Sequence, residues 1–372
     1  MKSNYKAIGE LVERVDERNR DASITTLIGV SIDKKFIPSV ANVIGTDLTN
    51  YKVIRKFDFA VSLMQVSRDE KIPVACQKEY EAAIMSPAYP IFRVKDTEII
   101  LPEYMEMWFM RNEFDREASF VAVGGVRGSM PWEEFAKLKL PVPTIEEQRK
   151  IVDRYNAITD RITLKKQIND NLLAATQAIY KSWFVDFEPF DNACPPNWKN
   201  GCVDDIAELY DSMRKPLSSL ERADMERAYP YYGAVSIVDY VDDFIFDGEY
   251  LLLSEDGIYV VDENGHPLLQ HITGKFWANN HAHILKGKAG FNEDSLYLFL
   301  SNTNMAPIVT GAAQPKINQA NLKSFPITIP TSEVVEKFNT LIQPFFDQRL
   351  SNEAEVKKLE TLKDLLLSRL VN

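Results

Sequence analysis

The feature that most constrains this chain is a sequence transition that occurs twice, 187 residues apart. Residues 138–152 read LKLPVPTIEEQRKIV, and residues 325–339 read FPITIPTSEVVEKFN. In both, a short apolar run ends at a proline and a charged, helix-forming segment begins. The offset that carries Pro143 onto Pro330 also carries Leu172 onto Leu359. We therefore predict a tandem duplication, in which two copies of one structural unit follow each other.

Weaker similarities extend the repeat toward the start of each copy. An offset of 189 aligns YKVIRKFD (51–58) with YVDDFIFD (240–247), and an offset of 198 aligns IGEL (8–11) with IAEL (206–209). Insertions in loops would account for the drift in offset.

The second part of each copy has the pattern of one long helix. Residues 144–184 contain no proline or glycine, and Thr144 followed by Glu147 is a capping box that marks a helix start. Apolar residues then follow a heptad, which slips at Lys165 and Lys166 and resumes at Ile168. Forty helical residues would span about 60 Å. The second helix is expected over 331–371, with a kink or break near Pro344.

Each long helix has one apolar stripe that must be buried, and two arrangements would bury it. Each helix could pack onto the globular part of its own copy. Alternatively, the two helices could pair with each other in antiparallel fashion, because duplicated copies can pack isologously as a homodimer does.

The remaining segments have mixed α and β patterns. Alternating or apolar runs predict strands within 55–66, 250–254 and 281–287, whereas 102–118 and 293–305 have helical periodicity. The expected fold class is α+β, with two globular domains separated by two long antiparallel helices that form a coiled-coil spacer. The expected boundaries are 1–140 and 191–325 for the globular domains, and 141–190 and 326–372 for the helices.

Composition limits the cellular setting. The chain lacks an apolar run long enough to cross a membrane, and its charged start lacks the apolar core of a signal peptide. Cys76, Cys194 and Cys202 fit no metal-ligand spacing and are expected to be reduced thiols, so a cytoplasmic protein is predicted. Net charge is −11, and residues 191–322, with 9 basic and 19 acidic groups, account for −10 of it. Such acidity disfavours tight DNA binding by the chain alone.

No catalytic or cofactor motif is recognisable. GGVRGSM (124–130) lacks the ending of a P-loop. CPPNW (194–198) lacks the flanking residues of the loop in methyltransferases that act on the amino group of adenine or cytosine. All four histidines lie between His266 and His283. Since His281 and His283 flank Ala282 in a predicted strand, they should point the same way, with no cysteine or carboxylate at a ligand spacing. Structural, DNA-contacting and metal-binding roles stay open for them, but we predict no metal, no cofactor and no catalysis.

Several strings together resemble the specificity (S) subunit of type I restriction-modification systems over essentially the full chain. They are FAKLKLPVPTIEEQRKIVDRYNAI (135–158), LLAATQAIYKSWFVDFEPF (172–190), YYGAVSIVDYVDDFIFDGEYLLLSEDG (231–257), WANNHAHIL (277–285) and GAAQPKINQANLKSFPITIP (311–330). The second copy departs from the first in having Val335 where the first has Gln148 or Arg149 nearby, and in its Pro344.

The resemblance implies a non-catalytic subunit whose globular parts are target recognition domains. Each would read one half of a bipartite double-stranded DNA target, and the helices would set the spacing between the halves. It also implies two modification subunits, which bind S-adenosylmethionine and methylate adenine, and restriction (motor and nuclease) subunits. A non-DNA coiled-coil scaffold is the alternative function.

Specific readout of bases needs polar side chains on loops that face a groove. Candidate DNA-binding residues were chosen at the ends of predicted strands and at matching places in the two copies. They are Ser62, Gln65, Arg127 and Ser129 in the first copy, and Ser254, Asp256, Asn279, Asn280, His281, Gln314 and Lys316 in the second.

Overall fold

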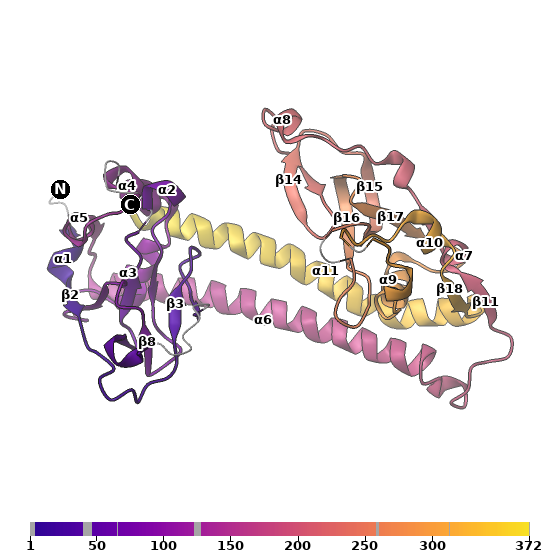
Figure 1. The fold of residues 1–372 in the computed structure, drawn as a ribbon, viewed down its shortest axis with the longest axis horizontal. Coiled ribbons are helices and arrows are strands. Elements are labelled where there is room, and N and C mark those ends of the chain that lie inside the picture. Colours follow the sequence, from indigo (N-terminus) through magenta and orange to yellow (C-terminus); the bar gives the residue numbers. More distant parts are fainter. Residues whose placement is uncertain are drawn as a thin grey trace. The chain divides into compact units, whose positions relative to one another are not determined.

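The computed structural model describes residues 4–39, 47–64, 66–122, 128–257, 260–311 and 313–371. It forms two compact units, one of Met1–Leu164 with Glu355–Asn372, the other of Lys165–Ala354. Each unit contains a globular part and a segment of both long helices, α6 (Ile145–Phe184) and α11 (Ser332–Ser368). Figure 1 shows α6 in magenta and α11 in yellow, each as one unbroken ribbon. The mixed α and β content confirms the predicted fold class.

The first unit is built on a four-stranded antiparallel sheet of order β2-β9-β6-β7. Its core is aromatic: Phe59 and Phe92 stack at 5.1 Å, and Phe109 meets Phe59 edge-on at 5.7 Å. The strands are β1 (Tyr5–Ala7), β2 (Val12–Val15), β3 (Ile28–Val30), β4 (Phe36–Pro38), β5 (Lys52–Arg55), β6 (Phe59–Val61), β7 (Val74–Cys76), β8 (Ala82–Met85), β9 (Ile91–Val94) and β10 (Lys139–Pro141). The helices are α1 (Ile8–Leu11), α2 (Val66–Asp69), α3 (Pro102–Phe109), α4 (Asn112–Val121) and α5 (Trp132–Lys137).

The second unit has a six-stranded sheet of order β12-β17-β15-β16-β13-β14, in which only the β13–β16 pair is parallel among the described strands. The strands are β11 (Lys199–Cys202), β12 (Ala207–Leu209), β13 (Tyr229–Tyr232), β14 (Ile237–Val241), β15 (Phe246–Ser254), β16 (Leu269–Ala278), β17 (Ala282–Gly287) and β18 (Pro326–Ile329). The helices are α7 (Val203–Ile206), α8 (Ser219–Arg222), α9 (Glu293–Ser301) and α10 (Gln319–Lys323).

The duplication is visible in equivalent backbone hydrogen bonds. Ile8 N donates to Leu138 O at 2.8 Å in the first unit, and Val203 N donates to Phe325 O at 3.1 Å in the second. These bonds align α1 with α7, an offset of 195. The predicted alignment of residues 8–11 with 206–209 is therefore wrong by one helical turn. The predicted alignment matched the similar strings IGEL and IAEL. In the structure, however, residues 207–209 form strand β12 and not a helix.

Helix α6 begins where the sequence indicated. The backbone N–H of Thr144 donates to Glu147 at 3.0 Å, and the N–H of Glu147 donates to Thr144 Oγ1 at 3.4 Å, which completes the capping box. One turn further on, the fully buried Gln148 side chain bonds three backbone groups. It accepts from Leu101 N and donates to Ile99 O and to Pro143 O, each at 2.9 Å. Gln148 thereby attaches the helix to its own globular part.

The two long helices pair in antiparallel fashion within each unit. In the first unit, Arg161 forms an ion pair with Glu355, while Val152 and Leu367 share one core. In the second, Asn352 donates to Asn169 at 2.7 Å, and the rings of Phe184 and Phe338 lie 4.7 Å apart. In these contacts the residue numbers rise along α6 and fall along α11, as expected for an antiparallel pair. Both arrangements that the sequence left open occur together, because these cores also contain residues of the globular parts.

The buried seam of α6 keeps its seven-residue spacing past Lys165 and Lys166, where the sequence predicted a slip. It continues through the buried Ile162, Asn169 and Thr176, which lie seven residues apart. The apolar pattern of the sequence does not reveal it, because Asn169 and Thr176 are polar. Helix α11 likewise continues through Pro344 without a break. Among the described residues, no helix combines the length and apolarity needed to cross a bilayer.

Candidate nucleic-acid interface

Three segments of the second unit hold its candidate DNA-binding residues, and these segments meet at one end of its sheet. Glu255, next to the end of β15, receives the Ile317 N–H on its carbonyl at 2.9 Å and donates its own N–H to His281 O at 2.9 Å. Asp256 forms a β-bridge with Lys316. Segments 254–256, 279–281 and 314–317 therefore form one surface, which we call the loop cluster. Residues far apart in the chain are thus brought together by the fold.

The side chains of the loop cluster differ in their access to solvent. The half-exposed His281 ring places Nδ1 2.6 Å from Asp256 Oδ1, and Lys316 Nζ lies 2.8 Å from Glu255 Oε1. Gln314 and Asn280 are exposed. Asn279 is buried and its Oδ1 accepts the His281 N–H at 2.8 Å, so it shapes the turn before β17. Four of these side chains, His281, Lys316, Gln314 and Asn280, can reach a ligand from this surface.

Ser254, the last residue of β15, belongs to the loop cluster but does not expose its side chain. Its side chain is fully buried, and its Oγ has no hydrogen-bond partner among the described residues. In this position it does not reach the surface.

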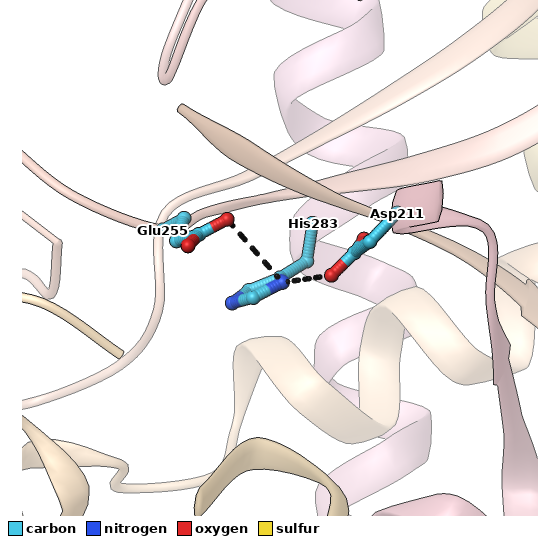
Figure 2. A group of neighbouring side chains, drawn as sticks. All are labelled: Asp211, Glu255 and His283. Carbon is cyan, nitrogen blue, oxygen red and sulfur yellow. Dashed lines mark hydrogen bonds and ion pairs between the residues drawn. The ribbon is translucent and has the colours of Figure 1, made fainter. Parts of the chain in front are cut away.

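A buried ionic network supports the loop cluster from below (Figure 2). The fully buried His283 in β17 places Nδ1 2.6 Å from Asp211 Oδ2 and Nε2 2.8 Å from Ile317 O. Both ring nitrogens therefore face oxygen atoms, and the ring connects Asp211 with the loop that contains Ile317. Asp211 also accepts the Ile284 N–H at 2.9 Å and the Gln319 amide at 3.0 Å.

Arg214 completes the network. Its Nη1 donates to Glu255 at 2.5 Å and to Ala282 O at 2.6 Å, and its Nη2 lies 3.5 Å from Asp211. Burial alone would raise the pKa of Asp211, but the hydrogen bond and charge of His283 hold this pKa below its ordinary value. Burial alone would also raise the pKa of Glu255, but the hydrogen bonds from Lys316 and Arg214 hold this pKa below its ordinary value. Both carboxylates are thus ionised and paired.

The sequence did not indicate this network. Asp211 and Arg214 lie in a segment without a recognisable pattern, and they meet His283 only through the fold. The prediction placed both His281 and His283 in one strand, but β17 begins at Ala282, so His281 belongs to the preceding turn. His281 is half-exposed there, whereas His283 is fully buried. Two carboxylates lie near His283 in space although none lies near it in sequence.

Two groups of histidine and carboxylates in the second unit have ligand atoms close enough to hold a metal ion. In the first, Asp211, Glu255 and His283, the cations Arg214 and Lys316 already occupy carboxylate oxygens that a metal would need. The second consists of Glu249, His271 and Asp294, with His271 Nε2 2.7 Å from Glu249. Burial raises the pKa of Asp294 to about 7, so a proton competes for its oxygen.

The raised pKa of Asp294 predicts a stability change with pH. The folded chain holds the carboxyl proton up to about pH 7, whereas an aspartate in the unfolded chain has its ordinary pKa of 3.8, so stability falls as pH rises between these values. Asp294→Asn should therefore raise the free energy of unfolding at pH 8 by on the order of 2 kcal/mol and leave it nearly unchanged at pH 4. Urea unfolding at both pH values measures the difference, and an equal effect at both would contradict the assignment.

The first unit has an equivalent junction. Met130 N donates to Leu63 O at 2.8 Å, and the offset of 187 carries Met130 onto Ile317, which makes the matching bond to Glu255. Ser62 and Ser129, both partly buried, are adjacent to this bond. The other two candidates of this unit, Gln65 and Arg127, lie outside the described residues.

Comparisons with known proteins agree with this duplicated architecture. A family model described as the type I restriction modification DNA specificity domain matches residues 77–174 and 195–363. A putative type I restriction enzyme specificity subunit of Haemophilus influenzae is 38% identical over 137 residues, which cover 37% of this chain and 34% of that protein. The MjaIX specificity subunit of Methanocaldococcus jannaschii is 22% identical over 301 residues, or 73% of this chain and 68% of that protein. The chain thus spans about a third of the first relative and about two thirds of the second.

A solved structure extends the similarity to the fold. The S subunit of a type I restriction-modification system from M. genitalium superposes with a TM-score of 0.57 at 13% identity, over 99% of this chain and 96% of that one. At this identity the likeness concerns the fold alone. The family model matches well over half of the residues, in two segments that include parts of both globular domains and both long helices. This chain therefore belongs to the family of type I restriction modification DNA specificity domains.

Proposed function

We propose that this chain is a DNA-recognition subunit whose two units each read one half of a bipartite double-stranded target. The observation that supports this most directly is the repeated strand-end junction, Met130 to Leu63 in one unit and Ile317 to Glu255 in the other. Two copies of one binding surface suit a target made of two half-sites. Joined by the 40-residue helix α6, they would favour one spacing between the half-sites, because such a helix is about 60 Å long.

Under this proposal the chain performs no catalysis itself. Two modification subunits, which bind S-adenosylmethionine, would methylate adenine in the target, and restriction subunits would join the same cytoplasmic complex. The names of the relatives, which are specificity subunits of restriction enzymes, support this assignment. Basic partner surfaces would supply most of the phosphate contacts, because the second unit is acidic and offers few of them.

The proposal is tested by mapping methylated adenines in the host genome with and without this protein. A bipartite motif with one fixed gap should disappear when the protein is removed. A gel-shift with the modification subunits and random DNA separates it from the scaffold alternative, which predicts no sequence preference.

Lys316 offers a test within the second unit. Lys316→Ala should weaken binding at one half-site only and should lower the slope of log affinity against log salt by about one, since one phosphate contact is lost. Lys323→Ala is the matched control, because Lys323 is equally exposed and pairs with Asp204 at 3.1 Å, but lies outside the loop cluster. Equal losses for both variants, or losses at both half-sites, would contradict a role for Lys316 in readout.

A further inference from the structure

Glu249, His271 and Asp294 form a polar cluster in the second unit, on the side of its sheet that faces α9. In the β15–β16 pair, Leu251 lies opposite His271. Residues two apart on a strand point to the same side, so Glu249 shares this side with His271. Asp294 reaches the same place from the first turn of α9. One histidine and two carboxylates thereby bring ligand atoms within 4.8 Å of one another.

The ring of His271 is held in one orientation. Its Nε2 lies 2.7 Å from Glu249 Oε1. The ring also stacks on Tyr297, with centroids 6.2 Å apart, and meets the ring of Phe346 at 61°. In the neutral ring that donates its Nε2 hydrogen to Glu249, Nδ1 has a lone pair that can bind a metal ion. A carboxylate on the second ring nitrogen is the usual arrangement around a metal-binding histidine.

Asp294 offers a buried oxygen beside this nitrogen. The residue is 3% exposed, and its Oδ1 has no hydrogen-bond partner among the described residues. Oδ1 lies 3.5 Å from His271 Nδ1. Two ligand atoms at tetrahedral angles around one zinc ion, each about 2.0–2.1 Å from it, are about 3.3 Å apart. Because a buried carboxylate oxygen without a donor is costly, this oxygen points to a bound cation.

Charge and space also suit a cation here. Among the described residues, no lysine or arginine forms an ion pair with Glu249 or Asp294, whereas Arg214 and Lys316 pair with the carboxylates of the other group. When ionised, the two carboxylates carry two negative charges, which one divalent cation balances. A cavity of about 180 Å³ borders His271 and has room for water molecules that complete the coordination.

We propose that His271 Nδ1 and Asp294 Oδ1 bind one zinc ion, with Glu249 as the positioning residue that holds the imidazole ring. An imidazole nitrogen combined with a carboxylate suits Zn²⁺, whereas Mg²⁺ and Ca²⁺ prefer oxygen ligands alone. The ion links β16 to α9. Gln343 of α11 donates to Asp294 Oδ2 at 3.3 Å, so the ion also strengthens the attachment of this long helix to its globular part. The site shares no residue with the loop cluster and does not depend on the proposed function.

The test uses the full chain after treatment with a chelator and dialysis. Titration with Zn²⁺ alone in a calorimeter should show one ion bound per chain, and the bound ion should raise the melting temperature. Co²⁺ in place of Zn²⁺ should give the visible absorption bands of a site with nitrogen and oxygen ligands. This spectrum reports the ligands themselves and does not follow from a change in stability.

Three variants separate the roles of the residues. His271→Ala and Asp294→Asn should each lower the affinity for zinc at least a hundredfold, because each removes a ligand. Glu249→Gln should lower it about 10–100-fold while the ion still binds, since the ring loses only its orienting partner. Asp294→Asn keeps the shape of the side chain, so it reports on the site even if His271→Ala fails to fold. The pH effect of Asp294→Asn on stability concerns the metal-free chain and is measured with a chelator present.

His266→Ala is the matched control. Its Nδ1 also lies 3.5 Å from a carboxylate oxygen, that of Asp262, but this pair is partly exposed and belongs to no group with a third ligand among the described residues. Its loss should leave zinc binding unchanged. The proposal is overturned if the unaltered chain binds no zinc, if binding survives both His271→Ala and Asp294→Asn, or if His266→Ala weakens it equally.

Discussion

Replacing His283 by alanine is expected to lower the free energy of unfolding by about 3–5 kcal/mol. The substitution removes a buried imidazole ring whose nitrogens lie 2.6 Å from Asp211 Oδ2 and 2.8 Å from Ile317 O. It leaves the Asp211 carboxylate buried with Arg214 at 3.5 Å as its remaining close cation. A buried charge that loses its partner costs far more than an exposed one, because water cannot replace the lost contact.

The measurement is urea unfolding followed by circular dichroism. His266→Ala is the matched control, because His266 is partly exposed and lies 3.5 Å from Asp262 in a turn, so its loss should cost less than about 0.5 kcal/mol. His281→Ala gives a second comparison two residues away. It should leave stability nearly unchanged but weaken binding at the half-site read by the second unit. A His283→Ala chain that unfolds like the unaltered one would mean that the network does not support the loops.

Gln148→Leu is expected to cost about 3–4 kcal/mol, although leucine fits a buried helix position by size and propensity. The side chain of Gln148 satisfies Leu101 N, Ile99 O and Pro143 O, all at 2.9 Å. Leucine would leave these three backbone groups without a partner. The loss falls on the junction between α6 and the first globular part, so separation of the half-sites should become less well defined as well.

Thermal and urea unfolding measure the loss of stability, and the range of gap lengths among methylated targets measures the loss of spacing. Gln167→Leu, at an exposed position of the same helix, is the control and should change neither. In the second copy, Val335 occupies the equivalent position and is buried in an apolar core. A polar anchor is therefore specific to the first unit, and a Gln148→Leu chain of normal stability would show that apolar packing suffices in both.

Much of the architecture was predictable because its determinants are local. The capping box at Thr144, the absence of proline and glycine up to Phe184, and the repeat of Pro143 at Pro330 require no knowledge of distant contacts. The sequence-based prediction was wrong where a buried helix position is occupied by a polar residue. The seam of α6 appeared to slip because Asn169 and Thr176 are polar, yet Asn169 is buried against Asn352 on the other helix.

The sequence by itself determined that this chain is a duplication in which each copy has one long helix. It could do so because helix periodicity, capping and repetition are written in neighbouring residues. Only the tertiary structure decided that Asp211, Arg214 and Glu255 surround His283, that Ser254 is buried, and that segments 254–256, 279–281 and 314–317 meet. Burial and ion pairing depend on which distant segments meet, and such meetings leave no period in the sequence.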